Sequence, residues 1–413
     1  MSDVHFMRLA LRLARRGYGM TSPNPMVGAV LVKNSKIIGR GWHRRAGLPH
    51  AEIEALHAAQ KSGHNPKGAT LYVTLEPCST QGRTLPCTDA IIAAGIKRVV
   101  VGAVDPNPRH SGQAFKILRR AGIKVNAIGN AGRNKRYTSS PDLRPPSPPL
   151  PTGERDGARG HQLANECLKL NEAFNHWIVH RTPFVTVKAA MTLDGKIATA
   201  NGESKWITGE KARAYGMKLR GSHDAILVGI NTILADNPGL TCRVVQGSKF
   251  KVQSPKQLRR IVLDSMARTP LKAKIVSDKF AELTTIVVSK QAPKNRVAAL
   301  AKRVNVLVDP STNSKLKTQN SKLDLKWLLK KLGSENVTSL LVEGGGEVNA
   351  SLLFGGFAHR VAFFYTPKVL GGQDSLKAVA GEGAKSLPEA RQLHDIEWKR
   401  LGPDLLLMAQ VAS

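Results

Sequence analysis

Cysteines, aromatic residues and long apolar runs are all scarce in this sequence. Four cysteines in 413 residues are too few for a scaffold held by disulfides, and they indicate a reducing compartment, so we expect a cytoplasmic protein. No uncharged apolar run reaches the ~18 residues of a membrane-spanning helix, so we expect no membrane partner. The 41% apolar content still suffices for buried cores, and the length predicts two domains.

Acidic residues are also scarce, because 30 Asp and Glu accompany 62 Lys and Arg and leave a net charge of +32. Such a charge attracts polyanions. The excess is densest in residues 249–331, which hold 20 basic and five acidic residues, yet the aromatics there are limited to Phe250, Phe280 and Trp327. Proteins that bind single strands usually interleave aromatics with the basic residues. We therefore interpret the charge as solvated basic faces, and we expect no specific nucleic-acid partner but a phosphorylated small molecule.

The first basic stretch, residues 7–16, is amphipathic and superficially similar to an organelle transit peptide. Asp3 lies just before it, no apolar core or cleavage-like site follows, and the segment runs directly toward an expected strand. We interpret it as a first surface helix.

Hydrophobic periodicity predicts alternating strands and helices over residues 1–130, which indicates an α/β layered domain. Residues 131–163 include six prolines between Pro141 and Pro151 and no periodicity, so we expect a Pro-rich linker or insertion without regular structure. Alternation resumes in a second α/β domain over residues 164–413. The expected strands are 27–32, 36–41, 69–75, 99–101, 123–127, 184–190, 225–228, 261–263, 285–288, 304–308 and 339–342, and the expected helices are 3–16, one from His50, 87–94, 113–120, 168–177, 210–221 and 325–332.

The most informative chemistry is a histidine with a glutamate two residues later, followed by two cysteines. His50, Cys78 and Cys87 are zinc-type ligands, whereas Glu52 need not be one. Alone, each has an ordinary explanation, because a lone buried cysteine is usually a small apolar residue. Together they predict a catalytic zinc, since three protein ligands leave a position for water, whose pKa the metal lowers to about 7.

A reaction follows from this ligand set. Water activated in this way attacks an amino-bearing carbon of an aromatic heterocycle, and Glu52 takes the proton from the water and returns protons to the ring nitrogen and the departing ammonia. The residues by themselves leave the heterocycle open.

Four segments around these residues narrow the choice of heterocycle. They are residues 21–25, His43 with 49–52, residues 75–87, and residues 105–108. Together they closely resemble the bifunctional deaminase/reductase family of riboflavin biosynthesis, whose cysteine spacing is long, as it is here. The resemblance implies a cytidine-deaminase-like three-layer fold, one zinc on the three ligands, and substrate contacts from Asn24, Arg83, Asp105 and Asn107. Two positions depart from the family: Thr80 stands where it commonly has a histidine, and residues 111–114 replace a glycine-rich turn.

A second site is indicated by Glu343-Gly344-Gly345-Gly346, between an expected strand and an expected helix, where free amides suit a phosphate. Alone, these glycines could equally form a tight connection, since they lack the G-x-G-x-x-G spacing of a dinucleotide-binding fold.

The family resemblance extends over residues 188–198, 202–208, 224–229 and 232–241 of the second domain. It implies a dihydrofolate-reductase-like fold that uses NADPH. The implied cofactor contacts are Ala190, Trp206, Thr232, Asp236, Ser265, Gly345, Gly346, Glu347, Val348, Asn349, Ala350 and Ser351. The implied substrate contacts are Lys188, Ser204, Arg220, Leu240, Arg243 and Glu343. Of these, Arg220 and Arg243 suit a substrate phosphate, which guanidinium binds bidentately, and Lys188 is a candidate general acid.

The expected function is therefore two consecutive steps of riboflavin biosynthesis, catalysed by a homo-oligomer. The first is zinc-dependent deamination of 2,5-diamino-6-(5-phosphoribosylamino)pyrimidin-4-one, and the second is NADPH-dependent reduction of its ribosyl group to ribityl. Two alternatives follow from the positive charge: a zinc deaminase that acts on nucleic acid, and a zinc-stabilised nucleic-acid-binding module without catalysis.

Overall fold

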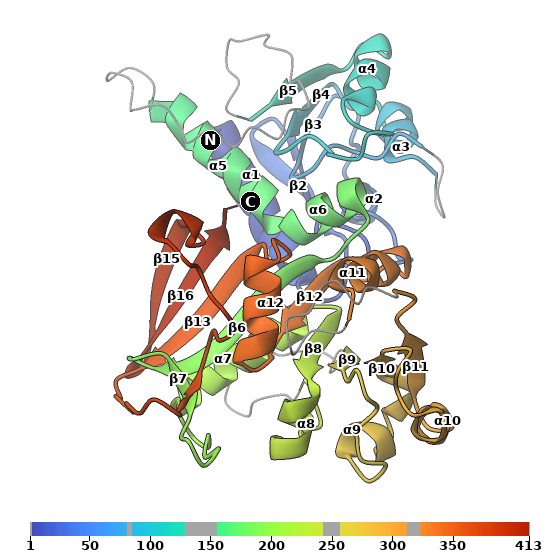
Figure 1. Cartoon of the computed structure of the whole chain (residues 1–413). Coiled ribbons are helices and arrows are strands. Elements are labelled where there is room, and N and C mark those ends of the chain that lie inside the picture. Colours follow the sequence, from blue (N-terminus) through green and yellow to red (C-terminus); the bar gives the residue numbers. More distant parts are fainter. Residues whose placement is uncertain (1, 81–84, 129–154, 243–256, 312–322, 413) are drawn as a thin grey trace. The chain divides into compact units, whose positions relative to one another are not determined.

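The structure is a computed structural model that describes residues 2–80, 85–128, 155–242, 257–311 and 323–412 (Figure 1). The chain divides into two compact units, Met1–His180 and Arg181–Ser413, which we call unit 1 and unit 2 and describe separately. Residues 131–154 of the predicted linker lie outside the described residues, as do the predicted substrate residues Arg83 and Arg243.

Unit 1 contains a five-stranded sheet in the order β2-β1-β3-β4-β5. The strands are β1 (Gly28–Lys33), β2 (Lys36–Trp42), β3 (Thr70–Val73), β4 (Arg98–Val101) and β5 (Lys124–Ala127). The β1–β2 hairpin turns at Asn34 and Ser35, which both have positive φ as a two-residue hairpin requires. β1 is antiparallel to β2 and β3, whereas β3, β4 and β5 are parallel, and the expected alternation of elements is confirmed.

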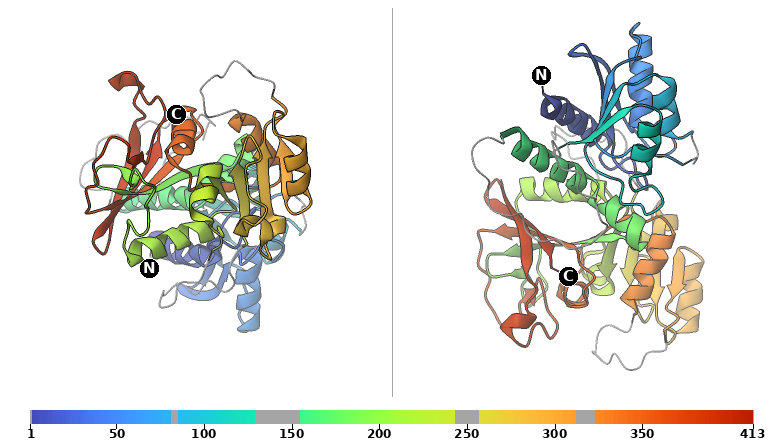
Figure 2. Two further views of the ribbon diagram at one scale, coloured as in Figure 1. Left: turned by 60° about the horizontal axis from the view of Figure 1, so that its bottom comes forward. Right: turned by 90° about the horizontal axis from the view of Figure 1, so that it is seen from above.

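Helices cover both faces of this sheet, because successive strand residues point to opposite sides. On one face, α2 (Ala51–Lys61), α3 (Cys87–Ala93) and α4 (Gln113–Arg120) pack on alternate strand residues that include Leu31 and Val73. On the other face, α1 (Asp3–Ala14) and α5 (Arg155–Leu170) pack on the intervening residues Val30 and Tyr72, and Figures 1 and 2 show α5 beside α1. The N-terminal segment is thus a structural helix with a deeply buried face.

The end of unit 1 differs from the predicted boundaries. Helix α5 begins inside the segment 131–163, and α6 (Glu172–His180) follows it, so unit 1 extends beyond the predicted start of the second domain at residue 164. Leu163 and Cys167 are buried against α1. These two residues lie one helical turn apart in a mainly polar segment. Because so few apolar residues repeat at helical spacing, the sequence next to the prolines did not predict a helix.

Unit 2 contains a nine-stranded sheet in the order β11-β10-β9-β8-β12-β6-β13-β16-β15. Its strands are β6 (Phe184–Thr192), β8 (Ala225–Gly229), β9 (Arg259–Leu263), β10 (Thr284–Val288), β11 (Asn305–Val308), β12 (Ser339–Val342), β13 (Arg360–Thr366), β15 (Leu393–Leu401) and β16 (Asp404–Val411), and β7 (Lys196–Ala198) pairs with β14 (Leu376–Lys377) outside it. The strands from β11 to β13 are parallel, and β16 and β15 continue the sheet antiparallel. Figure 1 shows the antiparallel strands at one end and β10 and β11 at the other.

The central strands of unit 2 are continuous apolar runs because helices bury both of their faces. Helices α11 (Leu325–Ser334) and α12 (Gly346–Phe354) cover one face. The opposite face is covered by α7 (Glu210–Ser222), α8 (Ile230–Asp236), α9 (Lys274–Ser277) and α10 (Lys294–Ala301). No helix among the described residues combines the length and apolar character needed to cross a membrane.

The glycines of β2 generate the first testable prediction, because the backbone of α2 lies directly on this strand. A Cβ at Gly41 would stand 2.2 Å from the carbonyl oxygen of Ala51 and 2.5 Å from the amide of Ala55. We expect Gly41→Ala to displace α2, to destabilise unit 1 by about 1–3 kcal/mol and to lower its zinc content, measured by chemical denaturation and metal analysis. Gly216→Ala in α7, where a Cβ meets no atom within 4 Å, is the control and should be neutral. Equal stability of the two variants would contradict this packing.

Candidate active sites

The first site lies at the starts of two helices and beyond the end of one strand of unit 1. His50 is the N-cap residue of α2, and Glu52 lies in the first turn of that helix. Cys78 follows β3, and Cys87 is the first residue of α3. The predicted placement of His50 and Cys87 at helix N-termini is confirmed.

The imidazole and the two thiols form one cluster. His50 Nδ1 lies 3.3 Å from Cys87 Sγ and 3.5 Å from Cys78 Sγ, and one ligand atom of each residue lies within 4.8 Å of the others. One nitrogen and two sulfur donors suit zinc, and three ligands leave one tetrahedral position open. The residues present therefore fit a catalytic zinc ion.

Without a metal, the contacts within the cluster favour a thiolate at Cys78, next to a protonated Cys87 whose pKa they raise. Hydrogen bonds from the Cys87 thiol and from the Cys87 backbone N–H, at 3.3 Å, lower the pKa of Cys78, and contact with the Cys78 sulfur raises the pKa of His50. Glu52 has only 3% of its surface exposed, and this burial raises the pKa of its carboxyl to about 7. A carboxyl with such a pKa is suited to accept and return protons near neutral pH.

Asn24 is connected to the ligand His50 through His43, which sequence reasoning quoted but did not assign. The Asn24 amide lies 3.2 Å from His43 Nε2, and His43 Nδ1 lies 3.1 Å from the carbonyl oxygen of Pro49. Because Nδ1 must donate to that carbonyl, Nε2 accepts from the Asn24 NH₂ group, and the Asn24 carbonyl remains for a ligand. The ring of His43 also meets that of His50 edge to face, with centroids 5.3 Å apart.

Asp105 and Asn107 are brought to the same region by Glu76, whose role the sequence did not reveal. The Glu76 carboxylate is 4% exposed and accepts backbone N–H groups of Asp105, Gly112 and Ala114 at 3.2, 3.0 and 3.1 Å. It thereby fixes the loop between β4 and α4 beside the strand end that leads to Cys78. Its place directly before Pro77-Cys78 was the available signal.

The second site centres on a carboxylate of unit 2 whose side chain is 13% exposed. Glu343 follows β12, Lys188 lies on β6 and Arg220 lies in the last turn of α7. Arg220 donates two hydrogen bonds of 2.8 Å to the two oxygens of Glu343, and Lys188 Nζ lies 3.8 Å from Glu343 Oε2. Although burial alone would raise it, the Arg220 and Lys188 charges lower the pKa of Glu343 to about 2.

This arrangement leaves Arg220 with fewer donors for a substrate phosphate than the sequence suggested. The guanidinium of Arg220 was expected to face a phosphate, but three of its five donors are used by Glu343 and by the carbonyl oxygen of Thr241. Lys188, Arg220 and Glu343 form one charged group, which sequence spacing could not show because they come from three separate elements.

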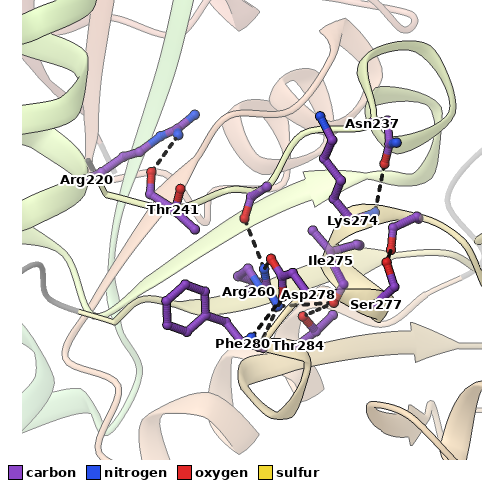
Figure 3. A network of polar contacts seen from close by, with 12 residues as sticks. Arg220, Asn237, Thr241, Arg260, Lys274, Ile275, Ser277, Asp278, Phe280 and Thr284 are labelled. Atoms are coloured by element: carbon purple, nitrogen blue, oxygen red, sulfur yellow. Dashed lines mark hydrogen bonds and ion pairs between the residues drawn. The ribbon is translucent and has the colours of Figure 1, made fainter. Parts of the chain in front are cut away.

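The loop 237–242, which carries Leu240, is supported by a buried arginine that sequence reasoning missed. Arg260 on β9 is 1% exposed. It donates to the carbonyl oxygen of Gly239 at 3.0 Å and pairs bidentately with Asp278 at 2.7 and 2.9 Å. Figure 3 shows Arg260 among Ile275, Asp278 and Phe280, and Arg220 donating to Thr241. The available signal was the pair Arg259-Arg260 directly before the apolar residues of β9.

The predicted cofactor residues gather along one edge of the unit 2 sheet. Thr232 and Asp236 lie on α8, which follows β8; Ser265 follows β9; and Gly345 and Gly346 begin α12, which follows β12. Since these strands are parallel neighbours, their carboxyl ends meet at this edge, where α/β sheets commonly bind ligands. A Cβ at Gly345, the N-cap residue of α12, would meet no atom within 4 Å, whereas one at Gly346 would stand 2.4 Å from the carbonyl oxygen of Lys377, so open space lies at Gly345.

Other predicted residues of unit 2 are less available to a ligand. Asn349 is fully buried and donates to the carbonyl oxygen of Ala378 at 2.8 Å, and Ala350 and Leu240 are 6% and 3% exposed. Trp206, by contrast, is 68% exposed with the Arg213 guanidinium 4.7 Å from its ring. The partly exposed or exposed remainder comprises Ala190, Ser204, Glu347, Val348 and Ser351.

Comparison with known proteins identifies the family. Residues 183–407 match the RibD C-terminal domain, and residues 1–103 match the cytidine and deoxycytidylate deaminase zinc-binding region. The riboflavin biosynthesis protein RibD of Actinobacillus pleuropneumoniae is 39% identical over 100% of this chain and 96% of its own length. The chain belongs to the RibD family.

Solved RibD structures agree with this assignment. RibD of Acinetobacter baumannii is 30% identical with a TM-score of 0.79, over 100% of this chain and 99% of that one. A diaminohydroxyphosphoribosylaminopyrimidine deaminase/5-amino-6-(5-phosphoribosylamino)uracil reductase of Thermotoga maritima is 33% identical with a TM-score of 0.75, over 99% of each chain. The predictions of a cytidine-deaminase-like first domain, a dihydrofolate-reductase-like second domain, and a bifunctional deaminase and reductase of riboflavin biosynthesis are confirmed.

The low pKa of Glu343 generates a prediction about stability and pH in this RibD protein. Its folded-state pKa of about 2 lies below the ordinary 4.5, so the unfolded chain binds the proton first as the pH falls. The ionised carboxyl therefore stabilises unit 2 above pH 4.5 by on the order of 3 kcal/mol, and this contribution decreases as the pH falls toward 2. We expect the stability difference between the wild type and Glu343→Gln, measured by urea unfolding, to shrink between pH 5 and 2.5.

The control for this measurement is Glu203→Gln, which changes an exposed carboxyl of the same unit. Its difference from the wild type should stay small and nearly constant over the same range. A difference for Glu343→Gln that does not change with pH would refute the proposed pairing with Arg220 and Lys188.

Proposed function

We propose that unit 1 deaminates 2,5-diamino-6-(5-phosphoribosylamino)pyrimidin-4-one, and that unit 2 reduces the ribosyl group of the product to ribityl with NADPH. The observation that carries the proposal is the buried carboxyl of Glu52 in the same helical turn that presents His50 to Cys78 and Cys87. The names of the RibD relatives, and of the Thermotoga neighbour in particular, support the choice of substrate.

For deamination, zinc held by His50, Cys78 and Cys87 would lower the pKa of a water at its open position to about 7. Glu52 accepts the proton of the attacking water and passes protons to the ring nitrogen and to the amino group that leaves as ammonia. The amino-bearing carbon thereby becomes a carbonyl. The burial that raises the pKa of Glu52 suits it to both halves of this transfer.

The pyrimidine would be held by groups that the fold fixes around this cluster. Asn24, whose amide NH₂ is committed to His43, presents its carbonyl oxygen to the substrate. Asp105 and Asn107 contact it from the loop that Glu76 anchors. These neutral and anionic groups suit a ring that carries several N–H donors.

For reduction, the reduced nicotinamide of NADPH supplies the hydride when bound. The C1′–O4′ bond of the ribosyl group breaks as C1′ is reduced, and O4′ takes up a proton. Lys188 is the group that we assign to donate it, because its ammonium lies beside the Glu343 carboxylate in a partly buried position. The glycine amides at the start of α12, with Thr232 and Ser265, would orient the cofactor along the sheet edge.

We further propose that the active form is a cytoplasmic homo-oligomer. None of the four cysteines, all of them in the described part of the chain, forms a disulfide, which supports a reducing compartment.

The proposed function is tested by incubating the protein with the phosphorylated diaminopyrimidinone and NADPH. We expect release of ammonia followed by oxidation of NADPH, and a much slower second step with NADH. Deamination of a single-stranded oligonucleotide in place of the pyrimidine would instead favour a nucleic-acid deaminase, and salt-sensitive binding of it without turnover would favour a zinc-stabilised binding module.

Substitution of the proposed proton shuttle should separate metal binding from catalysis. We expect Glu52→Gln to keep its zinc but to lose at least ~100-fold in deamination, whereas Cys78→Ala should lose both. Glu54→Gln is the matched control, since Glu54 lies on the same helix and pairs with Arg44 at 3.1 Å. Full deamination by Glu52→Gln, measured as ammonia release alongside metal analysis, would exclude Glu52 from the reaction.

A further inference from the structure

A second connection between the two loops of the first site is made by His110, which neither the motifs nor the ligand set assigned. His110 belongs to the loop that carries Asp105 and Asn107, and Thr80 belongs to the loop that follows Cys78. The His110 Nε2 atom lies 2.9 Å from the Thr80 hydroxyl. The two loops are thus joined by side chains as well as by Glu76.

The other nitrogen of the same imidazole faces Asp105. His110 Nδ1 lies 3.7 Å from Asp105 Oδ2, and the two side chains are only 18% and 10% exposed. Nδ1 is buried and has no hydrogen-bond partner within 3.5 Å, and a buried polar atom of this kind requires a reason. One tautomer satisfies the geometry: the Thr80 hydroxyl donates to Nε2, and Nδ1–H points to the Asp105 carboxylate.

Hydrogen bonds within the loop hold the backbone of His110 in place. The His110 amide donates to the carbonyl oxygen of Asn107 at 2.8 Å, and the Gln113 amide donates to the carbonyl oxygen of His110 at 2.7 Å. Asp105 Oδ1 accepts the backbone N–H of Asn107 at 2.9 Å. The carboxylate is therefore fixed through Oδ1 by the loop itself and faces His110 through Oδ2, so its rotation is restricted from both sides.

We propose that His110 is a positioning residue for deamination, which orients the Asp105 carboxylate toward the pyrimidine while the Thr80 hydroxyl holds the imidazole. This inference rests on the proposed function of the first site. It also assigns a role to Thr80, which stands where the family commonly has a histidine: in this chain the imidazole of His110 contacts the same loop through the Thr80 hydroxyl.

The proposal is tested by a double-mutant cycle on deamination. Thr80→Val keeps the shape of the side chain but removes the hydroxyl, and His110→Ala removes the imidazole. We expect each to lower kcat/KM by about tenfold, mainly through KM, since each removes the hydrogen bond between Thr80 and His110. The double variant should be no worse than the poorer single variant, and Thr80→Ser, which keeps the hydroxyl, should restore activity to within about twofold of the wild type.

Two control measurements separate positioning from a merely structural connection. Zinc content and the rate of the reductase on the deaminated substrate should be unchanged in all variants. A structural connection would lower zinc content or the active fraction and leave KM unchanged, and that outcome would overturn the proposal, as would additive effects in the double variant. Failure of the wild type itself to deaminate the pyrimidine would refute the proposed function, whereas wild-type activity in every variant would refute this inference alone.

Discussion

Parallel strands end at a common edge of their sheet, and both sites depend on this constraint. In unit 1 the parallel neighbours β3 and β4 lead to Cys78 and to Asp105, so a proposed metal ligand and a proposed substrate residue lie near each other although they are 27 positions apart in the sequence. In unit 2 the carboxyl ends of β8, β9 and β12 bring α8, Ser265 and the start of α12 to one edge. Helices then begin where the strands end, and their free amides face the same edge.

Three carboxyl groups at the two sites are stabilised by different surroundings. Glu52 has no arginine or lysine beside it among the described residues, so burial raises the pKa of its carboxyl, as the proposed proton transfer requires. Glu343 is paired with Arg220 and Lys188, which keep it ionised and fix its geometry. Glu76 is stabilised by backbone amides alone, and its function is to hold a loop. Chemically identical side chains therefore differ in pKa and in the contacts that they make because their partners differ.

The residues around both sites are held by a second set of polar side chains. His43 orients Asn24, Arg260 supports the loop that carries Leu240, and Glu76 fixes the loop of Asp105. Each of these contacts joins residues that lie far apart in the sequence. They could not be predicted because one polar side chain in or just after a strand carries no periodic signal, and its partners come from other elements.

The sequence by itself indicated the alternation of strands and helices, the β1–β2 hairpin, a candidate ligand set with Glu52, and the family. These depend on local spacing: apolar periodicity selects strand or helix, and a ligand set recurs as a motif. Only the tertiary structure decided that α5 belongs to unit 1, that Arg220 binds Glu343, and that Asn349 is buried. The physical reason is that burial and ion pairing depend on which distant segments meet, and a charged or weakly amphipathic segment has the same local pattern whether it meets a partner or water.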